Sequence, residues 1–498
     1  MSCTLGVDIG TFESKGVLVS HSGRIIGSAS RPHELIVPRA GWAEHRAEED
    51  WWGDFVHITR ALLDQTGIRP GQIDAVATSA IGPCMLPVDG NGHPLTNAVL
   101  YGVDTRASRE IDLLNREIGE DRILDLCGNA LTSQSVGPKI LWLRRHEKEI
   151  FRRTARVLTS TSYIVSRLTG HDVIDHYTAA NFSPLYDIAR QRWTTELTAG
   201  IISPERLPEL AWSTDIAGHV QAEAAKATGL AAGTPVTTGT IDAAAEAVSV
   251  GTRQEGDMMM MYGSTIFIIQ IAAEQLRDDR LWHAPWLYPG THAAMAGLAT
   301  SGTLTHWFRN QLARDLTRDE AFAALADEAA SSPPGANGLL ILPYFSGERT
   351  PLHDPMAKGS VFGLNLTHTR GDIYRALLEG IANGTAHVVD TYRETGHPPK
   401  RILAVGGGVR NQVWLQATSD IGRVPQIIAE KTIGASYGNA FLAACAAGIV
   451  EPGDIDAWNP EAGRITPRDL PVYRRQYGLF RKLYEQTRDI AAALDENR

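Results

Sequence analysis

The stretch LGVDIGTFESK, residues 5–15, places an acid, a glycine and a hydroxyl directly after an apolar run. The apolar run predicts a buried strand over Thr4–Ile9, and a second apolar run predicts another over Gly16–Ser20, so the segment is expected to form a β-hairpin. Asp8 then lies at the carboxyl end of the first strand. Because side chains at that end point into the crevice where α/β proteins bind ligands, the hairpin predicts a ligand site.

The same outline returns about half a chain later, at MMMMYGSTIFIIQ (258–270), although no acid stands at the equivalent place. A repeat of this kind predicts two related halves that each open with a hairpin; two unrelated hairpins are the alternative. The boundary falls near residues 243–256, and we assign residues 1–246 to the first domain and 247–498 to the second.

Strands and helices alternate through both halves, which predicts an α/β fold. IDAVATSAI (73–81) is a strand, PVTTGTID (235–242) is a strand that ends in an acid, and residues 401–422 are a strand, a glycine turn and a helix. THTRGDIYRALLEGIA (367–382) is a helix that Thr369 and Asp372 begin with a capping box.

Composition restricts the class of protein. The 498 residues carry a formal net charge of -10, which disfavours nonspecific binding to nucleic acid. The four cysteines form no CxxC pair, so neither a zinc site nor a disulfide framework is indicated. The sequence shows neither a secretory signal nor an apolar run long enough to span a bilayer. We expect a soluble cytoplasmic protein with no membrane or nucleic-acid partner.

Tight glycine turns are the candidate phosphate sites, because their backbone N–H groups can hold anions. The chain has no GxxxxGK[ST] motif, and GGGVRN lacks the third glycine of GxGxxG. Gly10-Thr11 and Gly263-Ser264-Thr265 provide one turn in each half, with a third at 406–408. We expect the first two to hold a triphosphate from opposite sides of a cleft, with Lys15 adding a positive charge.

Two acids stand at strand ends, Asp8 and Asp242. Mg²⁺ prefers one or two carboxylates together with water and phosphate oxygens, and a hydroxyl that attacks a phosphate needs a base within hydrogen-bond reach. The two acids would divide these roles. For Asp242 the alternative is a cap at the start of the helix AAAEAV.

Longer phrases carry a family resemblance. GWAEHRAEEDWW, GPKILWLRRHEKEIF, TTGTIDAAAEAVSVG and PYFSGERTPLHDPMAKGSVFGLNLTHTRGDIYRALLEGIA, together with the hairpins above, resemble the FGGY carbohydrate kinases, and xylulokinase-like members most. The similarity runs in order from about residue 4 to residue 450.

The resemblance implies two actin-like (ribonuclease H-like) ATPase domains around a deep cleft. It also implies transfer of the γ-phosphoryl group of ATP, with Mg²⁺, to a hydroxyl of a sugar or polyol. By position, Asp8 matches the acid near Mg²⁺ and Asp242 the catalytic base. The residues assigned to the nucleotide are Gly10 and Thr11 in the first turn, Gly263, Ser264 and Thr265 in the second, and Gly407, Gly408 and Asn411 beside adenosine.

The sugar-binding region departs from the family pattern. Xylulokinases carry a Gln-Met-His-Gly-like segment where this chain has SAIGPCML (79–86), and Tyr101 stands where tryptophan is common. YGVDTR (101–106) keeps Asp104 and Arg106, which are candidates to hydrogen-bond sugar hydroxyls, with a surface ion pair as the alternative. Trp42 is either a sugar-facing aromatic or a core residue, and Asp175 either contacts the sugar or caps a helix.

These departures leave several acceptors open: xylulose, ribulose, a tetrulose, gluconate or a polyol. The sequence is also compatible with an actin-like nucleotide-dependent binding protein or with an inactive relative. Asp242 and both phosphate turns favour the kinase over either of them. By analogy with the family, the chain is also a candidate homodimer.

Overall fold

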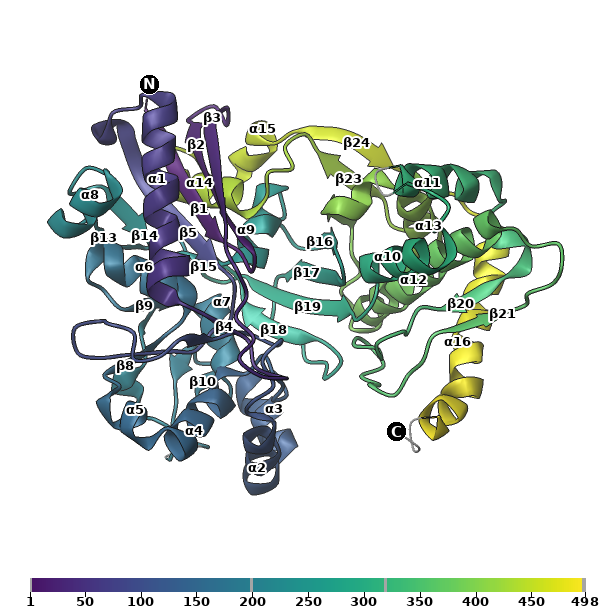
Figure 1. Ribbon diagram of the computed structural model, residues 1–498, viewed down its shortest axis with the longest axis horizontal. Helices are drawn as coiled ribbons and strands as arrows, with labels where there is room; N and C mark the ends of the chain where they lie inside the picture. Colours follow the sequence, from purple (N-terminus) through teal and green to yellow (C-terminus); the bar gives the residue numbers. More distant parts are fainter. Residues whose placement is uncertain (1, 198–199, 318–319, 495–498) are drawn as a thin grey trace.

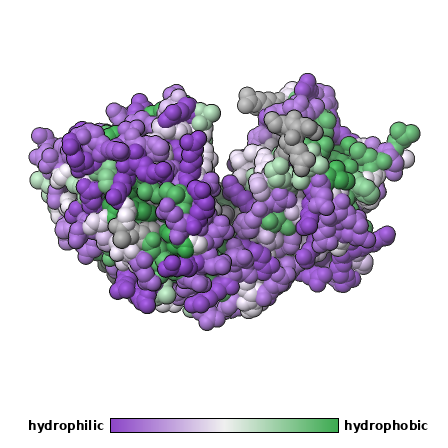
Figure 2. All heavy atoms as spheres, turned by 90° about the horizontal axis from the view of Figure 1, so that it is seen from below, coloured by the Kyte–Doolittle hydropathy of each residue, from purple (hydrophilic) through white to green (hydrophobic). Residues whose placement is uncertain are grey.

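The computed structural model describes residues 2–197, 200–317 and 320–494, and these form two lobes, each built on a mixed sheet of seven strands. The first half of the chain forms one lobe and most of the second half forms the other (Figure 1). A notch separates the lobes in the space-filling view of Figure 2. The predicted two-domain α/β fold is therefore confirmed.

The first sheet has the strand order β13-β14-β5-β1-β2-β3, with β15 also paired to β5. The predicted hairpin is present: β1 pairs antiparallel with β2 and parallel with β5. The strands are β1 (Cys3–Ile9), β2 (Glu13–Ser20), β3 (Ile25–Pro32), β5 (Ile73–Ala80), β13 (Ile216–His219), β14 (Pro235–Thr237) and β15 (Thr240–Ile241).

Successive side chains of β1 point to opposite faces of this sheet, so each face contacts a different helix. Leu5 and Val7 belong to the apolar cluster that also contains Phe55 of helix α1 (Gly53–Thr66). Residues of the other face meet helix α14 (Ala435–Ala446): the Thr4 hydroxyl donates to the Ala440 carbonyl at 2.7 Å. A Cβ atom on Gly6 would lie 2.0 Å from the Ser436 carbonyl oxygen, so α14 can pack this closely only against a glycine.

Helix α14 thus returns to the first lobe from the far end of the sequence (Figure 1). It also packs on helix α9 (Asp242–Ser249) and on β5. Residues 435–446 therefore lie, in space, in the lobe formed by residues 1–246, although the division by sequence placed them in 247–498. The reason is the small-residue face shared by β1 and α14, which no local pattern near residue 246 reveals.

The second sheet repeats the arrangement of the first. Its order is β18-β19-β17-β16-β22-β23-β24, and β16 pairs antiparallel with β17 and parallel with β22, as β1 does with β2 and β5. Its strands are β16 (Asp257–Tyr262), β17 (Ile266–Ala272), β18 (Trp282–Pro285), β19 (His292–Leu298), β22 (Arg401–Val405), β23 (Gln426–Ala429) and β24 (Glu461–Ile465).

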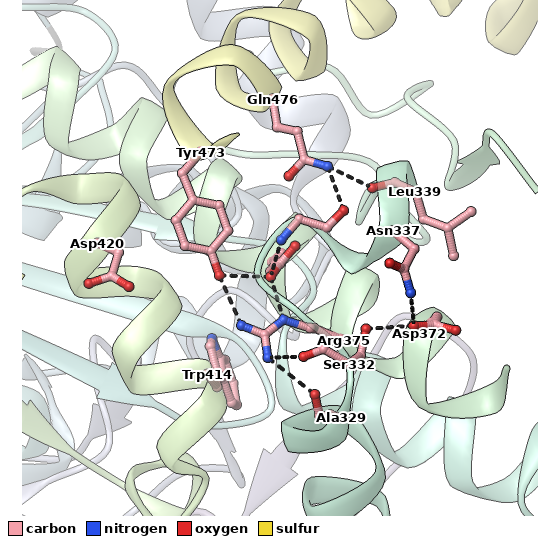
Figure 3. Close-up of polar contacts among 12 residues, drawn as sticks. Ala329, Ser332, Asn337, Leu339, Asp372, Arg375, Trp414, Asp420, Tyr473 and Gln476 are labelled. Carbon is pink, nitrogen blue, oxygen red and sulfur yellow. Dashed lines mark hydrogen bonds and ion pairs between the residues drawn. The ribbon is translucent and has the colours of Figure 1, made fainter. Parts of the chain in front are cut away.

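Helix α12 (Arg370–Glu394) forms the centre of the second lobe and starts with the predicted capping box of Thr369 and Asp372. A buried polar cluster fixes the C-terminal helix α16 (Pro471–Ala493) to it (Figure 3). The Arg375 guanidinium donates to the Ser332 carbonyl at 2.8 Å and to the Tyr473 hydroxyl at 3.2 Å. Because this buried charge also pairs with Glu379 on its own helix, its polar atoms are compensated.

The remaining elements complete the two lobes. The first adds helices α2 (Ser108–Ile118), α3 (Glu120–Cys127), α4 (Val136–His146), α5 (Lys148–Arg153), α6 (Ser160–Thr169), α7 (His176–Ala179) and α8 (Ala222–Thr228), the π-helix η1 (Ala47–Trp52), and the short strands β4 (Glu44–His45), β6 (Leu86–Val88), β7 (Ala98–Val99), β8 (Arg156–Leu158), β9 (Val173–Asp175), β10 (Tyr186–Asp187), β11 (Arg192–Trp193) and β12 (Glu209–Ala211). The second adds α10 (Gly302–Leu312), α11 (Ala321–Ser331), α13 (Gln412–Gly422), β20 (Leu340–Leu342) and β21 (Ser360–Phe362), and α15 (Ile455–Trp458) precedes β24. Within the described ranges, no helix has both the length and the apolar character needed to cross a bilayer.

Candidate active site

A cavity of about 370 Å³ lies between the lobes and brings the two predicted acids, Asp8 and Asp242, together. We call it the central cavity. Both lobes supply its wall. The first contributes Gly82, Pro83, Tyr101, Asn129, Gln134, Asn181 and Glu246, and the second contributes Met261, Thr265, Phe267, Trp282, His283, Met295 and Arg349.

The Asp8 carboxylate is oriented by residues from two distant segments. Ser79, at the end of β5, donates its hydroxyl to Asp8 Oδ1 at 2.7 Å. The Asn439 amide of α14 donates to the Ser79 oxygen at 2.7 Å and to the Val7 carbonyl at 2.8 Å. Asp8 is therefore held at the sheet edge by a chain of hydrogen bonds that begins in α14.

Burial raises the proton affinity of both acids, and the charge of Asp8 raises that of Asp242 further. Burial raises the pKa of Asp8 to about 6, against the opposing effects of the Ser79 hydrogen bond and the Lys15 charge. Burial and the charge of Asp8 raise the pKa of Asp242 well above its usual range, while the Ala243 N–H, which donates to Asp242 Oδ1 at 2.7 Å, opposes the shift. A cation between the carboxylates would favour ionisation of both.

Sequence reasoning missed a third acid, Glu246. It stands one helical turn after Asp242 on α9 and lines the same cavity. Burial and the charge of Asp8 raise its pKa to about 7, and the backbone N–H of Ala435 opposes this shift. The single acid inside the otherwise small and apolar AAAEAV was the available signal, because a residue four positions after Asp242 shares its helix face.

The first predicted phosphate turn follows directly after the carboxyl end of β1. The Gly10 N–H donates to the Glu13 carbonyl at 3.1 Å, which closes the turn, and Thr11 Oγ1 lies 3.2 Å from the Tyr101 hydroxyl. Lys15 stands opposite Asp8 in the β1–β2 ladder, and its ammonium is 3.1 Å from Glu13 at the surface.

The second predicted turn, Gly263-Ser264-Thr265, separates the central cavity from another one. Thr265 lines the central cavity, whereas Gly263 and Ser264 line a cavity of about 570 Å³ within the second lobe. Helix α10 begins against this turn: the Ser301 hydroxyl donates to the Gly263 carbonyl at 3.0 Å. One turn thus reaches two adjoining sites.

The second cavity has the aromatic lining that suits a purine base. Gly407, Gly408 and Asn411, which the family resemblance assigns to adenosine, lie on its wall together with Tyr262, Phe322, Tyr374 and Trp414. Asn411 also caps α13, since its Oδ1 accepts the Trp414 N–H at 3.1 Å. Aromatic side chains beside a glycine turn suit a nucleoside, because the rings can stack on the base while the turn offers backbone groups.

Asp104 and Arg106 form a buried ion pair, and the partly buried Trp42 packs against it. Arg106 pairs with Asp104 at 2.7 Å and with Glu44 at 2.8 Å, and Asp104 also accepts the Ala43 N–H. The Arg106 guanidinium lies 3.8 Å from the centre of the Trp42 ring. None of these three residues is among the described residues that line the central cavity. The Asp104 N–H donates to the Tyr101 carbonyl at 3.0 Å, which supports the cavity wall there, and direct contact with a sugar stays a prediction.

The open question about Asp175 is settled by its contacts. Its Oδ1 accepts the Thr178 N–H at 3.3 Å as the cap of α7, and Oδ2 accepts the hydroxyls of Ser213 and Thr240. The helix-cap alternative is therefore confirmed. In the part of the chain that the structure describes, no three His, Cys, Asp or Glu side chains gather closely enough to hold a metal ion by themselves.

Comparison with known proteins agrees with this architecture. Residues 3–249 match the N-terminal domain of the FGGY family of carbohydrate kinases, and residues 258–447 match its C-terminal domain. The chain is 29% identical to a xylulose kinase of Bacillus subtilis (strain 168), over 99% of each chain. It is 30% identical to a xylulose kinase of Escherichia coli (strain K12), over 97% of this chain and 98% of that one.

The fold comparison reaches the same conclusion. The crystal structure of xylulose kinase from Rhodospirillum rubrum superposes with a TM-score of 0.92 at 32% identity, covering 98% of this chain and 99% of that one. Both halves, both hairpins and the cavity between the lobes fall within these matches. This protein is therefore a member of the FGGY family of carbohydrate kinases, phosphotransferases that pass the γ-phosphoryl group of ATP to an alcohol group.

Proposed function

We propose that this kinase phosphorylates a small sugar in the central cavity, and that the sugar is a ketopentose such as xylulose. The similarity to xylulose kinases over the full length supports the choice of sugar. The observation that carries the proposal is the position of the 263–265 turn, which lines the nucleotide-sized cavity with Ser264 and the Asp242 cavity with Thr265. A phosphoryl group held by this turn would face the acceptor.

In this proposal adenosine lies against Gly407, Gly408 and Asn411, and the phosphates extend from Gly263-Ser264-Thr265 toward Gly10-Thr11. Asp242 accepts the proton of the attacking hydroxyl. Its raised pKa makes it a stronger base than an exposed aspartate, because burial and the nearby Asp8 disfavour its ionised form. Phosphoryl transfer has a loose transition state, so alignment and charge neutralisation supply most of the catalysis.

Asp8 fits the role of magnesium anchor. Mg²⁺ keeps most of its water shell and needs only one or two protein carboxylates, which suits a single oriented carboxylate at the cavity edge. When bound there through water, the ion would neutralise the phosphate oxygens. Closure of the lobes would exclude water, which otherwise competes with the sugar as acceptor.

The alternative acceptors are ribulose, a tetrulose, gluconate and a polyol, because the segment 79–86 differs from the xylulokinase pattern. Gly82 and Pro83 of this segment line the cavity and supply no polar side chain there. The sugar must therefore be recognised by other wall groups, among which Gln134, Asn181 and Arg349 are the candidates.

An ADP-release assay over a panel of ketopentoses, tetruloses, aldonates and polyols tests the proposal. We expect xylulose to give the highest kcat/KM, and Asp242→Asn to bind ATP while losing turnover by about 10²–10⁴-fold. Asp489→Asn, which changes an exposed carboxylate of α16, is the matched control. The assignment is wrong if no acceptor raises ADP release above the sugar-free rate, or if Asp242→Asn keeps its kcat.

A further inference from the structure

The imidazole rings of His33 and His45 contact the backbone of the Gly10-Thr11 turn. His33, directly after β3, directs Nε2 at the Gly10 carbonyl oxygen, 3.1 Å away. His45, in β4, directs Nε2 at the Thr11 carbonyl oxygen, also 3.1 Å away. The two rings meet edge to face with centroids 4.9 Å apart. Both carbonyls of the turn are therefore held by histidine.

His45 is neutral, because its two nitrogens have different partners. Nε2 faces a carbonyl and must donate, whereas Nδ1 accepts the indole N–H of Trp51 at 3.1 Å, and an indole nitrogen can only donate. Burial and the neighbouring His33 lower the pKa of His45 to about 4. One ring proton satisfies both contacts.

His33 is in the opposite situation, because both its nitrogens face acceptors. Nε2 faces the Gly10 carbonyl and Nδ1 lies 2.8 Å from Asp54 Oδ2, so both must carry a proton and the ring is an imidazolium. Asp54 also accepts the Ser14 hydroxyl at 2.7 Å and pairs with Arg31 at 3.2 Å. The His33 side chain is only 4% exposed.

The two acids near His33, Asp54 and Asp50, favour the charged ring, whereas His45 is neutral and Arg31 is a cation. Asp54 faces it from α1, Asp50 lies nearby in η1, His45 contacts it from β4, and Arg31 stands beside Asp54 on β3. Burial by itself lowers the pKa of His33, but the hydrogen bond and charge of Asp54, with smaller contributions from Asp50 and the Gly10 carbonyl, outweigh it and raise the pKa.

We propose that the His33 imidazolium is a positioning group for ATP. It holds the Gly10-Thr11 turn in place, and it gives the turn the positive charge that a lysine supplies in a P-loop. This rests on the proposed function, in which the turn holds phosphate. The Gly10 carbonyl and the Thr11 N–H belong to one peptide group, so a cationic donor on the oxygen polarises the N–H toward an anion. Lys15 is paired with the Glu13 carboxylate at the surface, whereas His33 contacts the turn directly through the Gly10 carbonyl.

The protonation state is tested without any turnover. In protein labelled with ¹⁵N at histidine, both ring nitrogens of His33 should show imidazolium signals at pH 7, identified by their loss in His33→Gln. In Asp54→Asn these signals should disappear at a lower pH than in the wild type. The residue that accepts the Nδ1 proton of His33 has then lost its negative charge, so the pKa of the ring falls. Neutral-ring signals at pH 7 would overturn the inference.

The role in binding is tested by calorimetry of MgATP without sugar. His33→Gln keeps a donor but no charge, and we expect about tenfold weaker MgATP binding, with kcat and the KM for sugar within about twofold. His57→Gln, an exposed histidine of α1, is the matched control and should bind as the wild type does.

A second measurement uses unaltered protein, so the test survives if His33→Gln folds poorly. Wild-type affinity for MgATP should fall as the pH rises through the His33 titration seen by NMR, and the fall should come at lower pH in Asp54→Asn. If the wild type binds MgATP with no such fall, or folded His33→Gln binds it equally well, the inference is wrong and the proposed function stands. If the wild type binds no MgATP, both are wrong.

Discussion

The hydroxyl of Tyr101 lies 3.2 Å from Oγ1 of Thr11, so one hydrogen bond joins the wall of the central cavity to the first predicted phosphate turn. Tyr101 in turn follows Leu100, and both their carbonyls accept hydrogen bonds from the buried ammonium of Lys139. The acceptor side and the nucleotide side of the proposed reaction are therefore linked within the first lobe.

Tyr101→Phe should weaken this link without disturbing the fold. A single neutral hydrogen bond contributes about 0.5–1.5 kcal/mol, so we expect kcat/KM to fall about two- to tenfold. The matched control is Tyr484→Phe, which removes a hydroxyl that donates to Asp354 at 2.8 Å in the second lobe. Steady-state kinetics that cannot distinguish the two variants would contradict a functional role for the bond.

Asp8→Asn should impair the response to magnesium. The variant keeps the size of the side chain and a carbonyl oxygen for Ser79, but loses the charge that attracts a divalent cation. We expect kcat/KM to fall by about 10²-fold or more and half-maximal activity to need more Mg²⁺. A magnesium titration of activity measures this, and a curve that coincides with that of Asp489→Asn would refute the assignment.

Glu246→Gln should stabilise the protein at alkaline pH. The pKa of Glu246 is raised from 4.5 to about 7 on folding, so its contribution to stability is full below pH 4.5 and is lost as the pH rises through about 7. Glutamine has no charge to bury. We expect the variant to gain about 1–3 kcal/mol over the wild type at pH 8 and much less at pH 5.

Urea unfolding at the two pH values checks this expectation. Glu255→Gln, an exposed glutamate just before β16, is the control and should change neither value. An equal gain at pH 5 and pH 8 would show that packing, rather than the ionisation of Glu246, is responsible.

Gly6→Ala should disturb both stability and activity through α14. The new Cβ would lie 2.0 Å from the Ser436 carbonyl oxygen and 2.4 Å from the Ala440 nitrogen, so the helix must move away from β1. We expect a loss of about 2–4 kcal/mol in the free energy of unfolding. Because Asn439 of α14 orients Asp8 through Ser79, activity should fall as well.

Thermal unfolding and turnover measure these effects, with Gly71→Ala as the control, since nothing lies within 4 Å of a Cβ at that position. If Gly6→Ala unfolds at the wild-type temperature, the close contact between β1 and α14 does not hold in solution.

Local patterns in the chain were enough to predict the elements that such patterns encode. Apolar runs with glycine turns indicated both hairpins, Thr369 and Asp372 marked the start of α12, and the acids at strand ends, Asp8 and Asp242, were both found in the central cavity. These predictions succeed because strand alternation, turns and caps depend on residues a few positions apart. The family phrases extended them to the fold of the whole chain.

Which distant residues meet became visible only in the folded molecule. Folding brings the Asn439 amide to the Ser79 hydroxyl and places Glu246 near Asp8. It brings the His33 ring against the Gly10 carbonyl. It also encloses Asp104 and Arg106 in an ion cluster with Glu44. Such contacts join segments tens to hundreds of positions apart, and they depend on how helices pack across a sheet. Burial and neighbouring charge, which set the proton affinities at this site, exist only after that packing is complete.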